Sequence, residues 1–132
     1  MIVLDASGLV DIALNRPNAP WVLDELMGHQ IVAPAHQPAE CLSAIARLVR
    51  SGTIAAATAR AALDDFAGLD QELVVPTADH LRWALARQDR IRVLDGLYVA
   101  LAADRRCSLV TTDHRLARAG ADVDIRTPPR AP

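Results

Sequence analysis

The chain has 132 residues, of which 52% are hydrophobic and 23% are charged. This composition excludes an intrinsically disordered chain and suits one domain built around one core. A formal net charge of −2 gives no general indication of nucleic-acid binding, and two cysteines are too few for a disulfide framework or a zinc site.

The two cysteines suit packing roles in a reducing cytoplasm, and two further features argue against a membrane span and a signal peptide. No apolar run reaches the roughly 18 residues that a transmembrane helix needs. The N-terminal run, MIVLDASGLV, lacks a basic region and contains Asp5, which is atypical of a signal peptide.

Short apolar runs alternate with longer segments of helical periodicity along the whole chain. In chain order, we expect a strand over Ile2–Asp5, helices over Ser7–Leu14 and Ala19–Met27, a strand over Ile31–Pro34, a helix over residues 39–49 that Gly52 ends, a helix over Thr53–Leu69, a strand over Leu73–Val75, helices over Thr77–Arg87 and Val93–Arg105, a strand over Ser108–Thr112 and a short helix over Asp113–Ala119. Val123–Thr127 is the candidate for a fifth strand.

This alternation predicts an α/β fold with a mainly parallel central sheet of four to five strands, flanked by helices. Residues 1–127 are expected to form a single domain, and the proline-rich residues 128–132 a flexible tail. In such sheets, ligands bind beyond the carboxyl ends of the strands. Candidate functional residues are therefore sought at those ends.

Four carboxylates from distant parts of the chain are predicted to meet at that edge. They are Asp5, Glu40, Asp95 and Asp113. Each alone has an ordinary structural interpretation, as a helix N-cap or as an acid at the positive end of a helix dipole. Together they would repel one another and raise one another's pKa unless a cation neutralised them. Oxygen ligands of this kind suit Mg²⁺ or Mn²⁺.

Several polar neighbours accompany these acids. Ser7 and Thr112 are candidates for hydrogen bonds to the carboxylates or for substrate contacts, although Ser7 also suits a helix N-cap. Ser43 and Arg47 follow Glu40 at helical spacing, so all three can share one helix face. Ser43 is therefore a further candidate for contacts to the carboxylates or to substrate, while a solvated helix face is the simpler interpretation of Arg47. A phospho-acceptor receiver domain also gathers acids at strand ends, but its lysine is missing here because every one of the basic residues is arginine.

Three segments carry a resemblance to a known family: MIVLDASGLVD, VAPAHQPAECLSAIARLVRSG and LDGLYVALAADRRCSLVTTDHRLARA. In these motifs and their spacing, the chain resembles PIN-domain ribonucleases of the VapC type, the toxins of bacterial VapBC toxin–antitoxin modules. The resemblance implies that Asp5, Glu40, Asp95 and Asp113 bind one or two Mg²⁺ or Mn²⁺ ions. Family members often have alanine where this chain has Gly96.

The resemblance further implies hydrolysis of RNA phosphodiester bonds, inhibition by a cognate VapB-type antitoxin, and a homodimer. Arginines flank the acids and are candidates for contacts to the RNA backbone; they are Arg82, Arg87, Arg90, Arg92, Arg115 and Arg118. The four histidines, His29, His36, His80 and His114, show no metal-ligand spacing and are interpreted as structural or surface residues. The alternative function is a catalytically inactive PIN-fold module that only contacts a partner or RNA.

Overall fold

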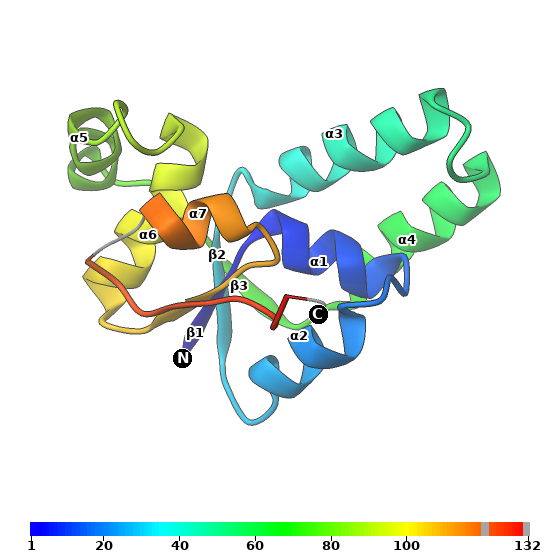
Figure 1. The fold of residues 1–132 in the computed structure, drawn as a ribbon, viewed down its shortest axis with the longest axis horizontal. Helices are drawn as coiled ribbons and strands as arrows, with labels where there is room; N and C mark the ends of the chain where they lie inside the picture. The colour runs from blue at the N-terminus through cyan, green and yellow to red at the C-terminus, as the bar shows by residue number, and fades with distance from the viewer. Residues whose placement is uncertain (120–121, 131–132) are drawn as a thin grey trace.

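A five-stranded parallel sheet forms the centre of the protein (Figure 1). The computed structural model describes residues 1–119 and 122–130. The strand order is β3-β2-β1-β4-β5, and all neighbouring strands are parallel. The strands are β1 (Ile2–Leu4), β2 (Ile31–Pro34), β3 (Gln71–Val74), β4 (Ser108–Val110) and β5 (Ile125–Arg126). The predicted α/β class, parallel sheet and fifth strand are confirmed.

Seven helices among the described residues connect these strands. They are α1 (Ala6–Ala13), α2 (Ala19–Leu26), α3 (Gln37–Arg50), α4 (Ala56–Gly68), α5 (Ala78–Ala86), α6 (Val93–Arg105) and α7 (His114–Ala119). Gly52 follows the C-cap residue Ser51 of α3 and adopts a left-handed backbone with φ of 74°, as expected of a glycine that ends a helix. None of the helices in the described ranges is both long and apolar enough to cross a membrane.

Hydrophobic residues cover both faces of the sheet, which is typical of parallel sheets. Ile2 and Leu4 pack on one side with residues of α1, α2, α3 and α4. Val3 points to the other side and packs with Tyr98, Val99 and other residues of α6. In Figure 1, α3 and α4 extend together away from the body as a helical hairpin. The core therefore has two halves, one on each face.

Several element boundaries differ from the sequence prediction, and three of these differences have a specific structural reason. The third strand begins at Gln71 rather than Leu73, because an edge strand beside β2 tolerates polar side chains that face solvent. The fourth strand ends at Val110 rather than Thr112, since the Thr111 and Thr112 segment turns toward the polar site described below. The second helix of the hairpin begins at Ala56 rather than Thr53, because Thr53 and Ile54 form a turn that donates to the Leu48 carbonyl.

The C-terminal segment follows β5. Pro128 is buried, whereas Pro129 and Arg130 are exposed. The remainder of the predicted tail, residues 131–132, lies outside the described residues, so the flexibility of the tail stays a prediction.

Candidate active site

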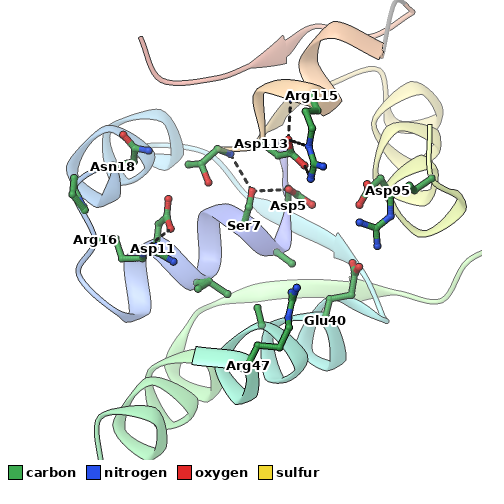
Figure 2. Close-up of a pocket in the computed structure, with 16 residues that line it drawn as sticks. Asp5, Ser7, Asp11, Arg16, Asn18, Glu40, Arg47, Asp95, Asp113 and Arg115 are labelled. Carbon is green, nitrogen blue, oxygen red and sulfur yellow. Dashed lines mark hydrogen bonds and ion pairs between the residues drawn. The ribbon is translucent and has the colours of Figure 1, made fainter. Parts of the chain in front are cut away.

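One pocket of about 560 Å³ collects all four predicted carboxylates (Figure 2). Asp5 directly follows β1, and Asp113 lies between β4 and α7. Glu40 belongs to the first turn of α3, which follows β2, and Asp95 to the first turn of α6. The parallel sheet brings these segments together because its carboxyl ends share one edge. We call this the acidic pocket.

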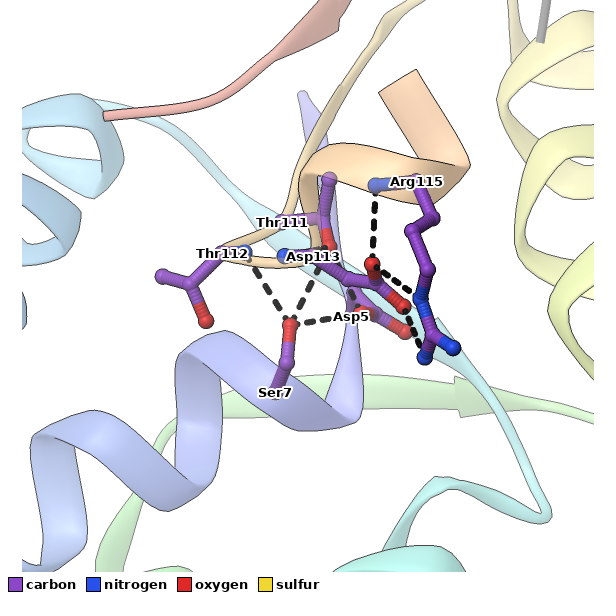
Figure 3. A network of polar contacts seen from close by, with 6 residues as sticks. All are labelled: Asp5, Ser7, Thr111, Thr112, Asp113 and Arg115. Atoms are coloured by element: carbon purple, nitrogen blue, oxygen red, sulfur yellow. Dashed lines mark hydrogen bonds and ion pairs between the residues drawn. The ribbon is translucent and has the colours of Figure 1, made fainter. Parts of the chain in front are cut away.

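Asp5 is held by two hydroxyl groups that donate to the same oxygen (Figure 3). Ser7 Oγ and Thr111 Oγ1 each lie 2.7 Å from Asp5 Oδ2. The backbone N–H groups of Thr112 and Asp113 donate in turn to these two hydroxyl oxygens, each at 3.0 Å. Since a hydroxyl has one proton, both protons point at Asp5. Neither of these hydroxyl groups donates to Asp5 Oδ1.

Thr111 is the residue that sequence analysis missed. It is fully buried, whereas the predicted Thr112 contributes its backbone N–H to Ser7 and not a side-chain bond to Asp5. Ser7 takes the predicted place beside Asp5. The sequence does show two consecutive threonines before Asp113. Choosing between them requires knowledge of where β4 ends.

The pKa of Asp5 is raised overall because the effect of burial outweighs that of the two hydroxyl donors, which act to lower it. Burial, together with the nearby Asp5 carboxylate, also raises the pKa of Asp95 to about 6, although Arg92 acts in the opposite direction. Glu40 and Asp113 add to the increase for Asp95. The acidic pocket therefore carries a charge that a cation would stabilise. Arg92 is exposed and lines the pocket, as predicted.

Glu40 behaves differently because donors surround it. Burial acts to raise its pKa, yet His36, Tyr98 and Arg92 lower it below its ordinary value overall. The Tyr98 hydroxyl donates to Glu40 Oε1 at 2.8 Å, and His36 Nε2 lies 3.2 Å from the same oxygen. His36 was interpreted only as a structural or surface residue, but it contacts a carboxylate of the site.

Asp113 is paired with Arg115. Its Oδ1 accepts from the Arg115 backbone N–H at 2.9 Å, and the guanidinium Nε and Nη2 approach the two carboxylate oxygens at 3.3 and 3.4 Å. Burial favours the neutral acid, but these contacts lower the pKa of Asp113 overall. Arg115 thus lies in the acidic pocket as predicted and neutralises one of its acids.

The pocket lining differs from the sequence analysis at Ser43 and Asp11. Ser43 is exposed and is absent from the residues that line the acidic pocket, because Ala44 and Arg47 occupy that side of α3. Asp11 lines the pocket and was missed. It is one helical turn after Ser7, and this spacing on one face of α1 was its only indication in the sequence.

The donor set fits a hard divalent cation, because carboxylate oxygens are the ligands that Mg²⁺ and Mn²⁺ prefer. In the side-chain positions of the described residues, no three His, Cys, Asp or Glu side chains are arranged to hold one ion. Glu40 Oε1 accepts from Tyr98, and Asp113 pairs with Arg115. A cation bound by Asp113 would therefore compete with Arg115 for this carboxylate.

The fold agrees with comparisons to known proteins. The PIN domain family model matches residues 2–122, so the chain belongs to the PIN-domain family. Among named relatives, it is similar to Ribonuclease VapC3 of Mycobacterium tuberculosis, with 40% identity over 124 residues that cover 89% of this chain and 86% of the relative. Ribonuclease VapC12 of the same organism is 35% identical over 126 residues, covering 89% and 91%.

A solved structure supports the same fold. The chain is similar to VapBC2 from Rickettsia felis, whose structure was determined bound to a DNA fragment from the promoter of this pair. The TM-score is 0.70 at 16% identity, and the match covers 96% of this chain and 98% of that chain. At this identity the likeness shows the fold alone.

Proposed function

We propose that this protein is a metal-dependent endoribonuclease and the toxin of a type II toxin–antitoxin pair. One observation carries the proposal: four carboxylates from four separate segments line one pocket at the carboxyl edge of the sheet. The names of the VapC relatives, which are ribonucleases, support the same activity. The reaction would be hydrolysis of an RNA phosphodiester bond.

The carboxylates are suited to hold Mg²⁺ or Mn²⁺, with Asp5 and Asp95 as the central ligands. Such an ion supplies an activated water and stabilises charge on the attacking and leaving oxygens. Ser7 and Thr111 fix the Asp5 carboxylate by donating to Oδ2. Glu40, with its lowered pKa, remains ionised near neutral pH and is available to accept a proton or orient a water.

Arginines around the acidic pocket supply the positive charge that RNA requires. Two neighbouring pockets share Asp113 and Arg115 with the acidic pocket, one between α6 and α7 and one beside the C-terminal segment. The arginines that line the three are Arg16, Arg47, Arg90, Arg92, Arg115, Arg118 and Arg130. We propose that these residues contact the RNA backbone.

Two arginines of the predicted substrate track have other partners. Arg82 pairs with Asp79 on the exposed surface of α5. The Arg87 guanidinium lies 3.7 Å from the ring centre of Trp83 and also donates to the Trp83 carbonyl. Neither residue lines the three pockets, so neither is assigned to RNA.

We also propose a VapB-type antitoxin as the partner of this chain, supported by its similarity to VapC relatives and to the VapBC2 structure. A homodimer is supported by exposed apolar residues. Leu81 and Leu85 lie one turn apart on α5 and are 55% and 60% exposed. Val93 and Leu94 at the start of α6 are each 44% exposed. Surfaces of this kind commonly mark contacts between proteins.

The activity is tested with the protein purified without a partner. Single-stranded RNA is incubated with wild type, Asp95→Asn and Asp64→Asn in Mg²⁺ or Mn²⁺, with and without EDTA. Asp64 is an exposed acid on α4 and serves as the matched control. We expect cleavage by wild type and Asp64→Asn, and its loss in Asp95→Asn or with EDTA. If all three proteins bind RNA and none of them cleaves it, the inactive binding module is favoured.

A further inference from the structure

Tyr98 and His36 both reach the same oxygen of Glu40. Tyr98 lies three residues after Asp95 on α6 and is fully buried, yet its hydroxyl donates across to Glu40 Oε1 on α3 at 2.8 Å. His36 precedes α3, and its Nε2 is 3.2 Å from this oxygen. The two rings meet edge to face, with centroids 5.0 Å apart. Glu40 is therefore contacted from two elements.

The direction of each proton follows from the partners. The phenol has one proton, and the carboxylate can only accept it. His36 Nε2 lies 3.1 Å from the Leu94 carbonyl oxygen as well as near Glu40 Oε1, and both of these are acceptors. We therefore assign the imidazole proton to Nε2. Its Nδ1 is buried and has no hydrogen-bond partner among residues 1–119 and 122–130, so the ring's polar contacts are made through Nε2.

These contacts connect the segments that carry two acids of the site. Leu94 directly precedes Asp95, and His36 contacts its carbonyl from the start of α3. Tyr98 makes the reverse connection, from α6 to Glu40. Because the phenol ring is packed in the core, its hydroxyl has little freedom to follow a moving carboxylate. In Figure 2 the Glu40 carboxylate faces the side of the pocket where Asp95 lies.

A role in core packing alone does not explain why residue 98 is a tyrosine. Phenylalanine would fill the same place in the core without requiring a partner for a buried hydroxyl. A tyrosine here adds one thing, a donor aimed at Glu40. The contacts of Tyr98 and His36 both use Glu40 Oε1 and leave Glu40 Oε2 for a ligand.

We propose that Tyr98 and His36 are positioning residues that hold Glu40 at a set distance from Asp95, so that the two carboxylates can bind the same divalent cation. The inference rests on the proposed function. Outer partners of this kind typically change metal affinity 10- to 100-fold when they are removed. Neither residue is expected to touch the cation or the RNA.

The test is a titration of the purified protein with Mn²⁺, with bound ion measured by electron paramagnetic resonance. We expect Tyr98→Phe to raise the Kd for Mn²⁺ by roughly 10-fold or more. In a Glu40→Gln background, the same change is expected to have no further effect, because the group that it positions is gone. A merely structural role would weaken binding equally in both backgrounds.

His36 gives a second, independent comparison. His36→Gln keeps an N–H donor of similar reach and is expected to bind Mn²⁺ nearly as wild type does, whereas His36→Leu is expected to bind it as weakly as Tyr98→Phe. Urea unfolding in EDTA checks that each variant folds. If Tyr98→Phe does not fold, the two His36 variants decide the question.

The outcomes separate this inference from the proposed function. If Asp95→Asn weakens Mn²⁺ binding but Tyr98→Phe and His36→Leu do not, the positioning role is wrong and the proposed metal site stands. If wild type binds Mn²⁺ no better than Asp95→Asn does, the metal site and the positioning role are both wrong.

Discussion

Of the four predicted carboxylates, Asp5 is buried, whereas Glu40, Asp95 and Asp113 are partly exposed. A buried carboxylate is costly without donors, and Asp5 receives two of them on one oxygen. The donors are themselves fixed by backbone N–H groups of the segment that carries Asp113. At the scale of single residues, Asp5 and Asp113 are thus connected through Ser7 and Thr111 (Figure 3).

Thr111→Val is expected to destabilise the protein. It removes a donor to a buried acid and leaves the Asp113 N–H without its acceptor. Hydrogen bonds to charged groups contribute about 1.5–3 kcal/mol, and we expect the free energy of unfolding to fall by about that amount in urea titrations. Thr112→Val is the matched control with a smaller expected loss, since Thr112 contacts the Ser7 hydroxyl through its backbone and its side chain interacts with the less deeply buried Asp11. Equal losses in both variants would contradict the assignment of Thr111.

The two threonines illustrate what sequence alone can give. Asp5, Glu40, Asp95 and Asp113 were predicted because each follows an apolar strand or begins a helix at one edge of the sheet. The choice between Thr111 and Thr112 depends on where β4 ends, and hydrophobicity is no guide there because both residues are the same. His36 was not recognised for a different reason: its contacts to Glu40 and Leu94 depend on how the starts of α3 and α6 lie relative to each other.

At the scale of elements, the packing of α5 against α6 explains Gly96. A Cβ at this position would lie 3.2 Å from Ala84 Cβ and 3.4 Å from Ala84 Cα. Ala84 Cα belongs to the backbone of α5, which cannot rotate away as a flexible side chain does. The glycine therefore allows close approach of two helices directly beside Asp95, a relation that no local pattern in the sequence reveals.

Gly96→Ala is expected to lower stability although alanine favours helix by about 1 kcal/mol. Overpacking of a tight contact typically costs about 1–3 kcal/mol, and the middle of this range exceeds the gain. We expect a net loss of roughly 1 kcal/mol in the free energy of unfolding. The measurement is urea unfolding of the metal-free protein.

A double-mutant cycle with Ala84→Gly identifies the cause. Ala84→Gly removes the Cβ that the new methyl group meets. It should therefore cost less in the Gly96→Ala background than in wild type, since it restores space there. Equal costs in the two backgrounds would show that the contact with Ala84 is not the source of the loss.

At the scale of the whole molecule, the net charge of −2 hides an uneven distribution. Seven of the 14 arginines line the acidic pocket and its two neighbours, around the carboxylates. Arg118 and Arg130 come from α7 and from the segment after β5, and both line the C-terminal side of this surface. Local charge, rather than the total, decides how a polyanion approaches.

Arg118→Gln and Arg130→Gln are each expected to lower the affinity for RNA and to make this affinity less dependent on salt concentration. Each arginine that contacts a phosphate of a single strand contributes about 0.7 to the slope of log K against log salt concentration. We expect each substitution to reduce the slope by about that amount, measured by fluorescence anisotropy with single-stranded RNA in an Asp95→Asn background that prevents cleavage. Arg60→Gln is the control, because Arg60 is exposed on α4 and lines none of the three pockets. If Arg60→Gln lowers the slope as much as the other two substitutions, the RNA is attracted by overall charge and not by this arginine surface.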